Sequence, residues 1–332
     1  MIFGSKNIFL FWNKGEKDIP LIHKMNIDNM KNRLKNSDWK IILTTLDKND
    51  KYYVGNLINL PKYFFQIKNK IKDIDSLGGN QSDIVRLRLL EKYGGIYFDT
   101  SVILLKNRIE DISLYKKFIK KDADLAGYTN YTFTRKIKDN KNYFNQAKDG
   151  IELGVLYAKK NNKLLKIFNK EIDKYWKWKN INNTYKEYPP FKEFNLTPVS
   201  FLNEYHVHYS IYHLIITRDK TLLDNLVVQS MHMKGKEDSQ EDGPYSVSDR
   251  FCREKDGYGG AKPIKILNAF LEGNVQSNKE VITTLKDRVD MFLKMDLIVI
   301  PGYMRIEIEK KFQSFEDFYN IKSCYKYFYN FW

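Results

Sequence analysis

The stretch GGNQSDIVRLRLLEKYGGIYFDTSVILL, residues 78–105, contains the pattern that decides the fold. Its polar tripeptide NQS is typical of a helix start, and Asp83 would then place a negative charge in the first turn. The pair Gly94-Gly95 predicts the end of this helix, because glycine adopts the left-handed conformation that terminates helices. The apolar residues that follow predict a short buried strand, which ends at Asp99.

Three charged residues of this stretch are candidates for a binding site. Ligands of open α/β sheets bind beyond the carboxyl ends of strands, where Asp99 would lie and could hold a divalent cation. Asp83 and Arg86 are three residues apart, so one helix face presents a carboxylate and a guanidinium. An exposed ion pair is the alternative interpretation of that face. The glycine pair and the acid at the strand end favour the binding site.

The run SDIVRLRLLEKYGGIYFDTS resembles the core signature of the capsular polysaccharide synthesis glycosyltransferases and related DXD-motif sugar transferases, a group that includes the glucosylating domains of large clostridial toxins. These residues stand at the spacing of that signature: Ser82, Asp83, Arg86, Leu90, Tyr93, Gly94, Gly95 and Asp99. The resemblance implies an α/β fold with a GT-A-like, Rossmann-type mixed sheet flanked by helices and a helical or irregular C-terminal part. It also implies a hexosyltransferase-like glycosyltransferase that binds a nucleotide-sugar and retains the anomeric configuration.

The resemblance assigns roles to the motif residues. It implies contacts with the donor for four of them: Ser82, Asp83, Arg86 and Gly95. Within this set, Asp83 and Arg86 would bind hydroxyls of the donor sugar as catalytic residues. Asp99 would bind the divalent cation, Mn²⁺ or Mg²⁺, that bridges the diphosphate. Ser101 stands where many relatives carry the second aspartate of the DXD motif, so it is a weak candidate ligand and metal dependence stays an open question.

Two other segments extend the resemblance. Residues 6–12, KNIFLFW, read as a first strand, and the equivalent strand and loop of the family lie against the donor base. Trp12 and Asn13 are therefore donor-binding candidates, with core packing as the alternative for the tryptophan. The run IELGVLYAKK makes Glu152 a catalytic candidate near the anomeric carbon or the acceptor hydroxyl, with a solvent-facing acid as the alternative.

Residues 229–260 form a long polar stretch with little periodicity, which is typical of functional lids or disordered insertions. His232 with Gly235 gives an H-x-x-G pattern that resembles the late metal and diphosphate loop of some retaining GT-A transferases. That resemblance makes His232 the third candidate metal ligand. Lys234 and Lys236 are candidate partners of the diphosphate, and a surface turn is the alternative for the whole motif.

Three histidines, His206, His208 and His213, lie close together in the chain. His206 and His213 would share a face of a helix, whereas His206 and His208 would share a face of a strand. No cysteine or nearby acid completes a zinc ligand set of the usual spacing, so the pattern disfavours zinc and leaves the role of the histidines open.

The remaining chain predicts further regular elements. Hydrophobic periodicity predicts helices over residues 21–34, 162–178 and 281–295. Short apolar runs predict strands over residues 39–46, 122–128 and 149–157. Residues 51–77 are predicted to be helical with a break at Pro61. The order strand, helix, strand at the start of the chain indicates a parallel βαβ unit.

We expect a catalytic domain over residues 1–260. It would contain a nucleotide-sugar-binding core of about residues 1–160 and an acceptor side with a mobile loop at about residues 176–260. Residues 261–332 would form a helical, aromatic-rich extension packed on the core. The lysine and aromatic residues of its tail leave contact with a membrane interface as the alternative.

The chain of 332 residues carries a net charge of +15, which predicts attraction to anions without selecting among them. Its lysines are scattered and no nucleic-acid motif is present, so a nucleic-acid partner is not expected. Two distant cysteines and the lack of a long apolar run favour a cytoplasmic protein, with peripheral contact at an anionic membrane as the alternative.

These patterns together predict a metal-dependent glycosyltransferase of capsular polysaccharide biosynthesis or surface glycan synthesis. It would move a sugar from a nucleoside-diphosphate sugar to a glycan or a lipid-linked glycan acceptor. A non-catalytic scaffold that binds glycans or nucleotide-sugars is one alternative, motivated by Ser101. A basic polyanion-binding protein is the other, motivated by the net charge.

Overall fold

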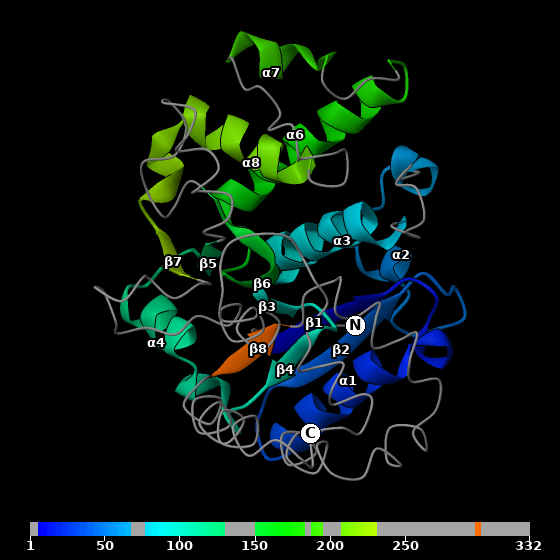
Figure 1. Cartoon of the computed structure of the whole chain (residues 1–332), viewed down its shortest axis with the longest axis vertical. Helices are drawn as coiled ribbons and strands as arrows, with labels where there is room; N and C mark the ends of the chain where they lie inside the picture. The colour runs from blue at the N-terminus through cyan, green and yellow to red at the C-terminus, as the bar shows by residue number, and fades with distance from the viewer. Residues whose placement is uncertain are drawn as a thin grey trace, which may run out of the picture. The chain divides into compact units, whose positions relative to one another are not determined.

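The computed structural model describes residues 6–67, 77–129, 150–182, 187–194, 207–230 and 296–299 (Figure 1). The described residues divide into two compact units. The first lies within Met1–Asp18, Asp38–Asp99 and Leu114–Gln229, and the second within Ile19–Ser37, Thr100–Ser113 and Ser230–Trp332. The predicted domain boundary at residue 260 lies outside the described residues, so it stays a prediction.

The first unit is built on a six-stranded mixed sheet with the order β2-β1-β3-β6-β5-β7. Its strands are β1 (Asn7–Trp12), β2 (Lys40–Thr45), β3 (Gly95–Phe98), β5 (Leu125–Thr129), β6 (Glu152–Ala158) and β7 (Leu226–Ser230). Strand β1 is parallel to β2 and β3, and β6 is antiparallel to β3 and β5. This mixed sheet confirms the predicted α/β class and the parallel pairing of the first two strands.

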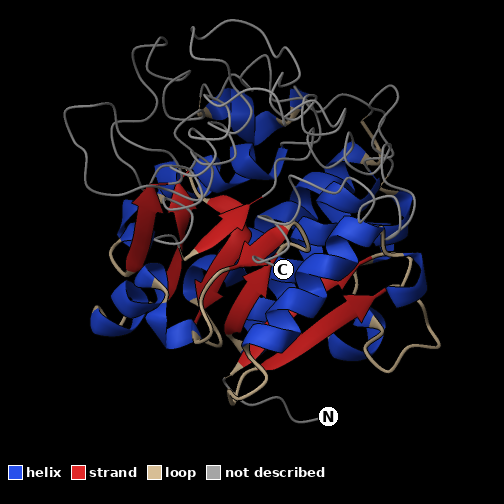
Figure 2. Ribbon diagram, turned by 60° about the horizontal axis from the view of Figure 1, so that its bottom comes forward, coloured by secondary structure: helices blue, strands red, loops and turns tan. Residues whose placement is uncertain are grey.

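Helices pack on this sheet in successive layers (Figures 1 and 2). Helix α3 (Leu77–Tyr93) lies against β1, β3 and β6, helix α6 (Lys163–Lys179) packs on α3, and α8 (Val207–Arg218) packs on α6. The unit also contains α2 (Val54–Leu57), α4 (Ser113–Lys120), α7 (Pro189–Glu193) and the 3₁₀ turns Glu16–Asp18, Lys62–Gln66 and Lys220–Leu223.

Helix α3 is enclosed by these layers. Its residues Ile84, Val85, Leu87, Leu89 and Leu90 are all fully buried, and Lys92 in its last turn is exposed. Apolar residues on most sides of a helix indicate that it packs in the interior of a protein. The polar residues of its N-terminal half are therefore also held inside the unit.

The second unit contains α1 (Leu21–Arg33), the 3₁₀ turn Ile109–Asp111, and a small antiparallel sheet of β4 (Val102–Leu104) and β8 (Leu297–Val299). Helix α1 is fastened to the β4 segment by two amide side chains. Asn26 Nδ2 donates to the carbonyl of Thr100 at 2.9 Å, and Asn29 Nδ2 donates to the carbonyl of Leu104 at 2.9 Å.

The central helix begins earlier than the sequence predicts. It starts at Leu77, so the NQS tripeptide lies within the helix and Asp83 is in its second turn. The prediction was wrong because tertiary packing overrides the low helix propensity of the glycines there. Asn80 is fully buried, and Gln81 Nε2 donates to the carbonyl of Phe64 at 3.2 Å.

The predicted end of this helix is confirmed. Gly94 and Gly95 have φ angles of +66° and +99°, in the left-handed region that favours glycine. A Cβ on Gly95 would also lie 2.5 Å from the carbonyl oxygen of Asn7 on β1. The glycine pair therefore turns the chain directly from α3 into β3, and Asp99 follows that strand.

The other helices and strands predicted from the sequence agree with the structure to different degrees. The elements predicted at residues 21–34, 39–46, 122–128, 149–157 and 162–178 correspond to α1, β2, β5, β6 and α6. The helical prediction for residues 51–77, with a break at Pro61, is confirmed only in part. Residues 51–67 contain the short α2 and a 3₁₀ turn that begins just after Pro61, and Leu77 begins α3. Proline lacks the N–H that a continuing helix requires. The helix predicted at residues 281–295 lies outside the described residues.

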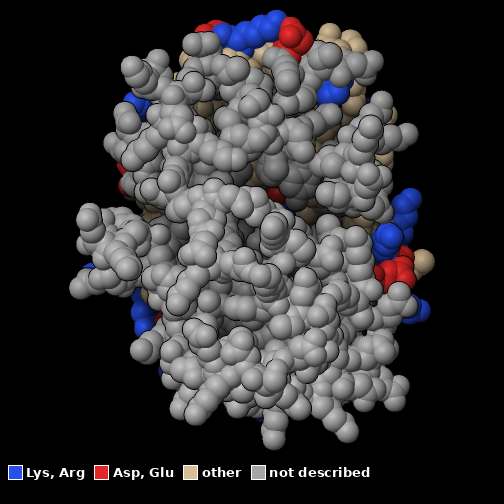
Figure 3. All heavy atoms as spheres, viewed as in Figure 1, with Lys and Arg blue, Asp and Glu red and all other residues tan. Residues whose placement is uncertain are grey.

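The described surface mixes both signs of charge. At the top of Figure 3, where Figure 1 places α7, lysine or arginine side chains lie beside acidic ones. The exposed ion pair of Lys192 with Glu187 belongs to this region. Among the described residues, no helix is long and apolar enough to span a bilayer.

Candidate functional site

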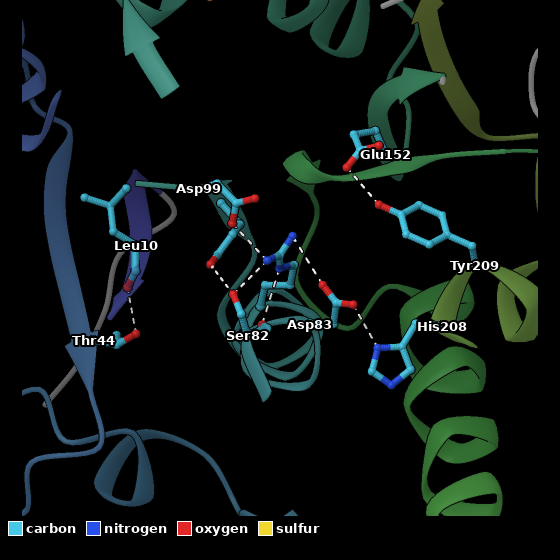
Figure 4. Close-up of polar contacts among 10 residues, drawn as sticks. Leu10, Thr44, Ser82, Asp83, Asp99, Glu152, His208 and Tyr209 are labelled. Carbon is cyan, nitrogen blue, oxygen red and sulfur yellow. Dashed lines mark hydrogen bonds and ion pairs between the residues drawn. The ribbon is translucent and has the colours of Figure 1, made fainter. Parts of the chain in front are cut away.

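A buried cluster of charges lies at the N-terminal half of α3. Arg86 sits at its centre, with Nη1 3.4 Å from Asp83 Oδ1 and Nη2 2.8 Å from Asp99 Oδ1 (Figure 4). The side chain of Arg86 is 6% exposed and that of Asp83 is 12% exposed. The alternative of a solvent-exposed ion pair on this helix face is therefore wrong.

Arg86 is fixed by further contacts. Its Nη2 donates to Ser82 Oγ at 2.7 Å, and its guanidinium carbon lies 4.6 Å from the ring centre of Tyr97 on β3. Tyr97 Oη and Ser82 Oγ are 3.0 Å apart, which closes the network. Burial lowers the pKa of Arg86, but Asp99, Tyr97 and Asp83 raise it, and the net shift is upward. The guanidinium therefore stays charged and holds one orientation.

Asp99 is the most accessible of the three charges. Its side chain is 33% exposed, and it leaves the end of β3 where the backbone N–H of Asp99 donates to the carbonyl of Gly154 on β6 at 2.8 Å. A Cβ on Gly154 would lie 2.8 Å from Asp99 Oδ2. Glycine at position 154 thus makes room for this carboxylate at the carboxyl end of β3, where open α/β sheets bind ligands.

The first turn of α8 adds two residues to the site. His208 Nδ1 lies 2.9 Å from Asp83 Oδ2, and the indole N–H of Trp176 on α6 donates to His208 Nε2 at 3.1 Å. Tyr209 Oη donates to Glu152 Oε1 at 2.8 Å (Figure 4). The side chains of His208 and Tyr209 therefore reach two different carboxylates of the site, on α3 and β6.

Glu152 lies beside this cluster, and its hydrogen-bond partner Tyr209 interacts electrostatically with Asp83 and Arg86. Burial raises the pKa of Tyr209 well above its usual value, and the negative charges of Glu152 and Asp83 raise it further, while Arg86 opposes them. The Tyr209 hydroxyl therefore keeps its proton and donates a hydrogen bond to the Glu152 carboxylate. The structure thus joins Asp83, Arg86 and Asp99 by ion pairs, and Glu152 is hydrogen-bonded to Tyr209, which interacts electrostatically with Asp83 and Arg86.

Sequence reasoning missed Trp176 and Tyr209 and left the role of His208 open. These residues lie on α6 and α8, and His208 is 125 positions from its partner Asp83. No local pattern in the chain indicates such a pairing. The only signal available was the histidine cluster, whose spacing suits several structures equally.

The predicted donor-base residues lie elsewhere in the first unit. Trp12 ends β1, and its indole N–H donates to the carbonyl of Asp18 at 3.2 Å, while the carbonyl of Asn13 accepts from the N–H of Leu46 at 3.3 Å. Since β1 and β3 are parallel neighbours, Trp12 and Asp99 leave the sheet at the same edge. Gly95 begins β3 at the opposite end of the strand. The donor contacts of Trp12, Asn13 and Gly95 stay predictions.

The predicted metal ligands are only partly described. His232 lies outside the described residues, as do Lys234 and Lys236, and Ser101 is a buried residue of the second unit. Within the described part of the chain, no three His, Cys, Asp or Glu residues form a group that could hold a metal ion. Proteins usually bind Mg²⁺ through one or two carboxylates together with substrate phosphates. The partly exposed Asp99 carboxylate fits that kind of site.

Comparisons with known proteins give the following matches. Residues 2–188 match a family model described as capsular polysaccharide synthesis protein. The chain is 27% identical over 217 residues to O-glycosyltransferase braB of Annulohypoxylon truncatum. This match covers 59% of this chain and 46% of that protein. The chain is also 25% identical over 103 residues to glycosyltransferase afumC of Aspergillus fumigatus, and this match covers 31% of this chain and 26% of that protein. The chain thus spans less than half the length of these curated relatives.

Two solved structures are also similar. PaToxG glycosyltransferase matches with a TM-score of 0.35 at 14% sequence identity, covering 66% of this chain and 73% of that one. The UDP-bound glycosyltransferase domain from the YGT toxin matches with a TM-score of 0.35 at 13% identity, covering 86% of this chain and 89% of that one.

Proposed function

The chain belongs to the capsular polysaccharide synthesis protein family, and from this premise we propose that it is a glycosyltransferase that uses a nucleoside-diphosphate sugar and a glycan acceptor. The observation that carries the proposal is the buried cluster of Asp83, Arg86 and Asp99 at the carboxyl end of β3. Two of these charges, Asp83 and Arg86, are buried. Burying charges is costly unless their geometry is fixed and their partners are complete. Such clusters are common where a site must orient a polar substrate.

Asp83 and Arg86 would orient the donor sugar. Hydroxyl groups both donate and accept hydrogen bonds, so an adjacent carboxylate and guanidinium can bind neighbouring hydroxyls of one sugar ring. Because Arg86 is held by Ser82, Tyr97 and two carboxylates, it would need no rearrangement when the sugar binds. Orientation of a reactant can supply about 7–11 kcal/mol of the barrier reduction in favourable cases.

Asp99 would be the protein ligand of the divalent cation, Mn²⁺ or Mg²⁺. The cation would supply positive charge beside the departing diphosphate. Ser101 and His232 remain the further candidate ligands, and Lys234 and Lys236 the candidate partners of the diphosphate.

Glu152 would act on the acceptor side of the donor sugar. Its contact with Tyr209 fixes the carboxylate, as the pairing of a functional acid with an orienting donor requires. Whether the acid lies nearer the anomeric carbon or the acceptor hydroxyl decides its role. We propose retention of the anomeric configuration on the strength of the sequence resemblance. Trp12 and Asn13 would contact the donor base, at the sheet edge that Asp99 shares.

The acceptor and the cellular place are also proposals. A glycan or lipid-linked glycan acceptor suits a capsular polysaccharide synthesis family. A cytoplasmic enzyme that contacts an anionic membrane peripherally is supported by the net charge of +15.

One observation favours a second function. The ion pair between Arg86 and Asp99 gives this carboxylate a cationic partner already, and a serine stands at position 101. A non-catalytic member of the family that binds nucleotide-sugars would retain such a pair without turnover.

Release of nucleoside diphosphate from a panel of UDP-, GDP- and other nucleotide-sugars tests the proposal. We expect the wild-type protein to release diphosphate from one donor, more rapidly with Mn²⁺ than with a chelator. The anomeric signal of the product in proton NMR then tests retention. Binding of a donor without any turnover would support the non-catalytic alternative, and neither binding nor turnover would refute both functions.

A further inference from the structure

We infer that His208 is a positioning residue for Asp83, held as the neutral tautomer with its proton on Nδ1 by the indole N–H of Trp176. The consequence for catalysis rests on the proposed function, whereas the tautomer does not.

The hydrogen-bond partners of His208 determine its tautomer. Trp176 Nε1–H lies 3.1 Å from His208 Nε2, and an indole nitrogen can only donate. His208 Nε2 must therefore accept and carries no proton. On the other side, Nδ1 lies 2.9 Å from Asp83 Oδ2, and a carboxylate only accepts. The proton of the neutral ring is therefore on Nδ1, directed at Asp83.

His208 is placed to act through Asp83 rather than on a substrate. Its side chain is 0% exposed, whereas the Asp83 side chain retains some exposure. Both of its ring nitrogens are engaged by protein groups, so neither is left for a sugar. A buried imidazole with this pattern matches the orienting role that a second residue plays for a functional carboxylate.

The two partners of Asp83 hold its carboxylate from opposite sides. Oδ1 faces Arg86 Nη1 at the long distance of 3.4 Å, and Oδ2 faces His208 at 2.9 Å. Without His208, the carboxylate could turn toward the guanidinium and form a closer pair, since a fork with two parallel bonds is the preferred geometry of arginine and a carboxylate. His208 therefore keeps Asp83 from closing onto Arg86 and so preserves its capacity to bind a hydroxyl.

The hydrogen-bond chain from Trp176 through His208 to Asp83 forms because three helices pack in layers. Trp176 lies on α6, where its ring stacks on Tyr63 and meets His208 edge-on. These aromatic contacts fix the indole, and the indole fixes the imidazole. The stack of α3, α6 and α8 thus transmits a defined orientation to Asp83 through His208.

The first test is the ¹⁵N NMR signature of the His208 ring in the full-length protein, assigned by comparison with His208→Asn because the chain has five histidines. We expect a protonated Nδ1 and an unprotonated Nε2. Trp176→Phe removes the donor to Nε2 and should therefore shift the Nε2 signal, while Nδ1 stays protonated against Asp83. Trp178→Phe, a matched control on the same helix, should leave both signals unchanged. A protonated Nε2 in the wild-type protein would overturn the inference.

The second test is steady-state kinetics with a donor that the wild-type protein hydrolyses. His208→Leu should lower kcat/KM for the donor by about 10- to 100-fold, the range expected when an orienting partner is lost. His208→Asn can still place an amide N–H near Asp83 and should recover most of that loss. His208→Gln, whose amide reaches the Nε2 position instead, should not recover it.

Control measurements separate the outcomes. His213→Asn alters another histidine of α8, which contacts Thr217, and it should retain donor turnover. Thermal unfolding of each variant shows whether the fold persists. Full activity of a folded His208→Leu, or equal losses in His208→Asn and His208→Leu, would overturn the positioning role alone. Lack of turnover by the wild-type protein on every donor would overturn the proposed function and the positioning role together, even with the tautomer as inferred.

Discussion

The substitution Gly154→Ala should displace the Asp99 carboxylate with little effect on stability. The added Cβ would lie 2.8 Å from Asp99 Oδ2, whereas ordinary carbon–oxygen contacts begin near about 3.4 Å, so one group must move by roughly half an ångström. Gly154 lies within β6 and has no left-handed φ, so alanine suits its backbone. An alanine there should even add about 0.5–1 kcal/mol by restricting the unfolded chain.

The functional cost of that displacement should be large by comparison. A misplacement of about 1 Å in a catalytic site can cost about 100-fold in rate, so a shift of half that size predicts a loss of about 10-fold in kcat. The assay is release of nucleoside diphosphate, with urea unfolding of the same preparation. Gly127→Ala, on β5 of the same sheet, is the matched control, because its Cβ would lie 2.7 Å from Cδ1 of Ile151, the residue that precedes β6. Wild-type turnover by a folded Gly154→Ala would refute the placement of Asp99 in the site.

Three further predictions concern the same unit. Arg86→Lys should lower donor turnover by about 100-fold, because a single ammonium cannot bridge two carboxylates as the planar guanidinium does; turnover near the wild-type value would place Arg86 in a structural role. Tyr209→Phe should cost about 1–3 kcal/mol of stability by leaving the Glu152 carboxylate without this donor, and unchanged urea unfolding would contradict the contact. His213 should lower the free energy of unfolding in acid. Burial lowers its pKa from 6.5 to about 4, so between these two pH values the unfolded chain binds a proton at His213 and the folded protein does not. The expected loss is about 2 kcal/mol between pH 7 and pH 5, and His213→Gln should remove most of this dependence in urea titrations at the two pH values.

The end of α3, the strand β3 and the position of Asp99 could be predicted because the sequence pattern that indicates them is local. The glycine pair, the apolar run and the terminal Asp99 lie within six consecutive residues, and each constrains the backbone directly. The start of α3 could not be predicted in this way. Gly78 and Gly79 lower helix propensity, and only the burial of the following Asn80 and Gln81 shows why the helix extends through them.

The site also contains residues that the local sequence predicts and residues that only tertiary packing brings in. Asp83 and Arg86 could be paired from sequence because helix geometry fixes residues three apart on one face. The partners Trp176 and His208 are 32 positions from each other, and they meet only because α8 packs on α6. Tyr209 was equally inaccessible, since its contact with Glu152 joins a helix to a strand 57 positions away. Tertiary packing of α8 on α6 and near β6 determines these contacts, and no periodicity along the chain encodes that packing.

The most direct test of the central claim is donor turnover by Asp99→Asn, a change that removes the charge and keeps the shape of the side chain. Nucleoside diphosphate release would be followed over a titration of Mn²⁺, with Asp122→Asn as a control that removes an exposed carboxylate elsewhere in the unit. We predict that Asp99→Asn loses at least about 100-fold in kcat/KM and its response to the metal, while the control behaves as wild type. Turnover by folded Asp99→Asn at the wild-type rate, with the same dependence on Mn²⁺, would contradict the assignment of this cluster as the transferase site.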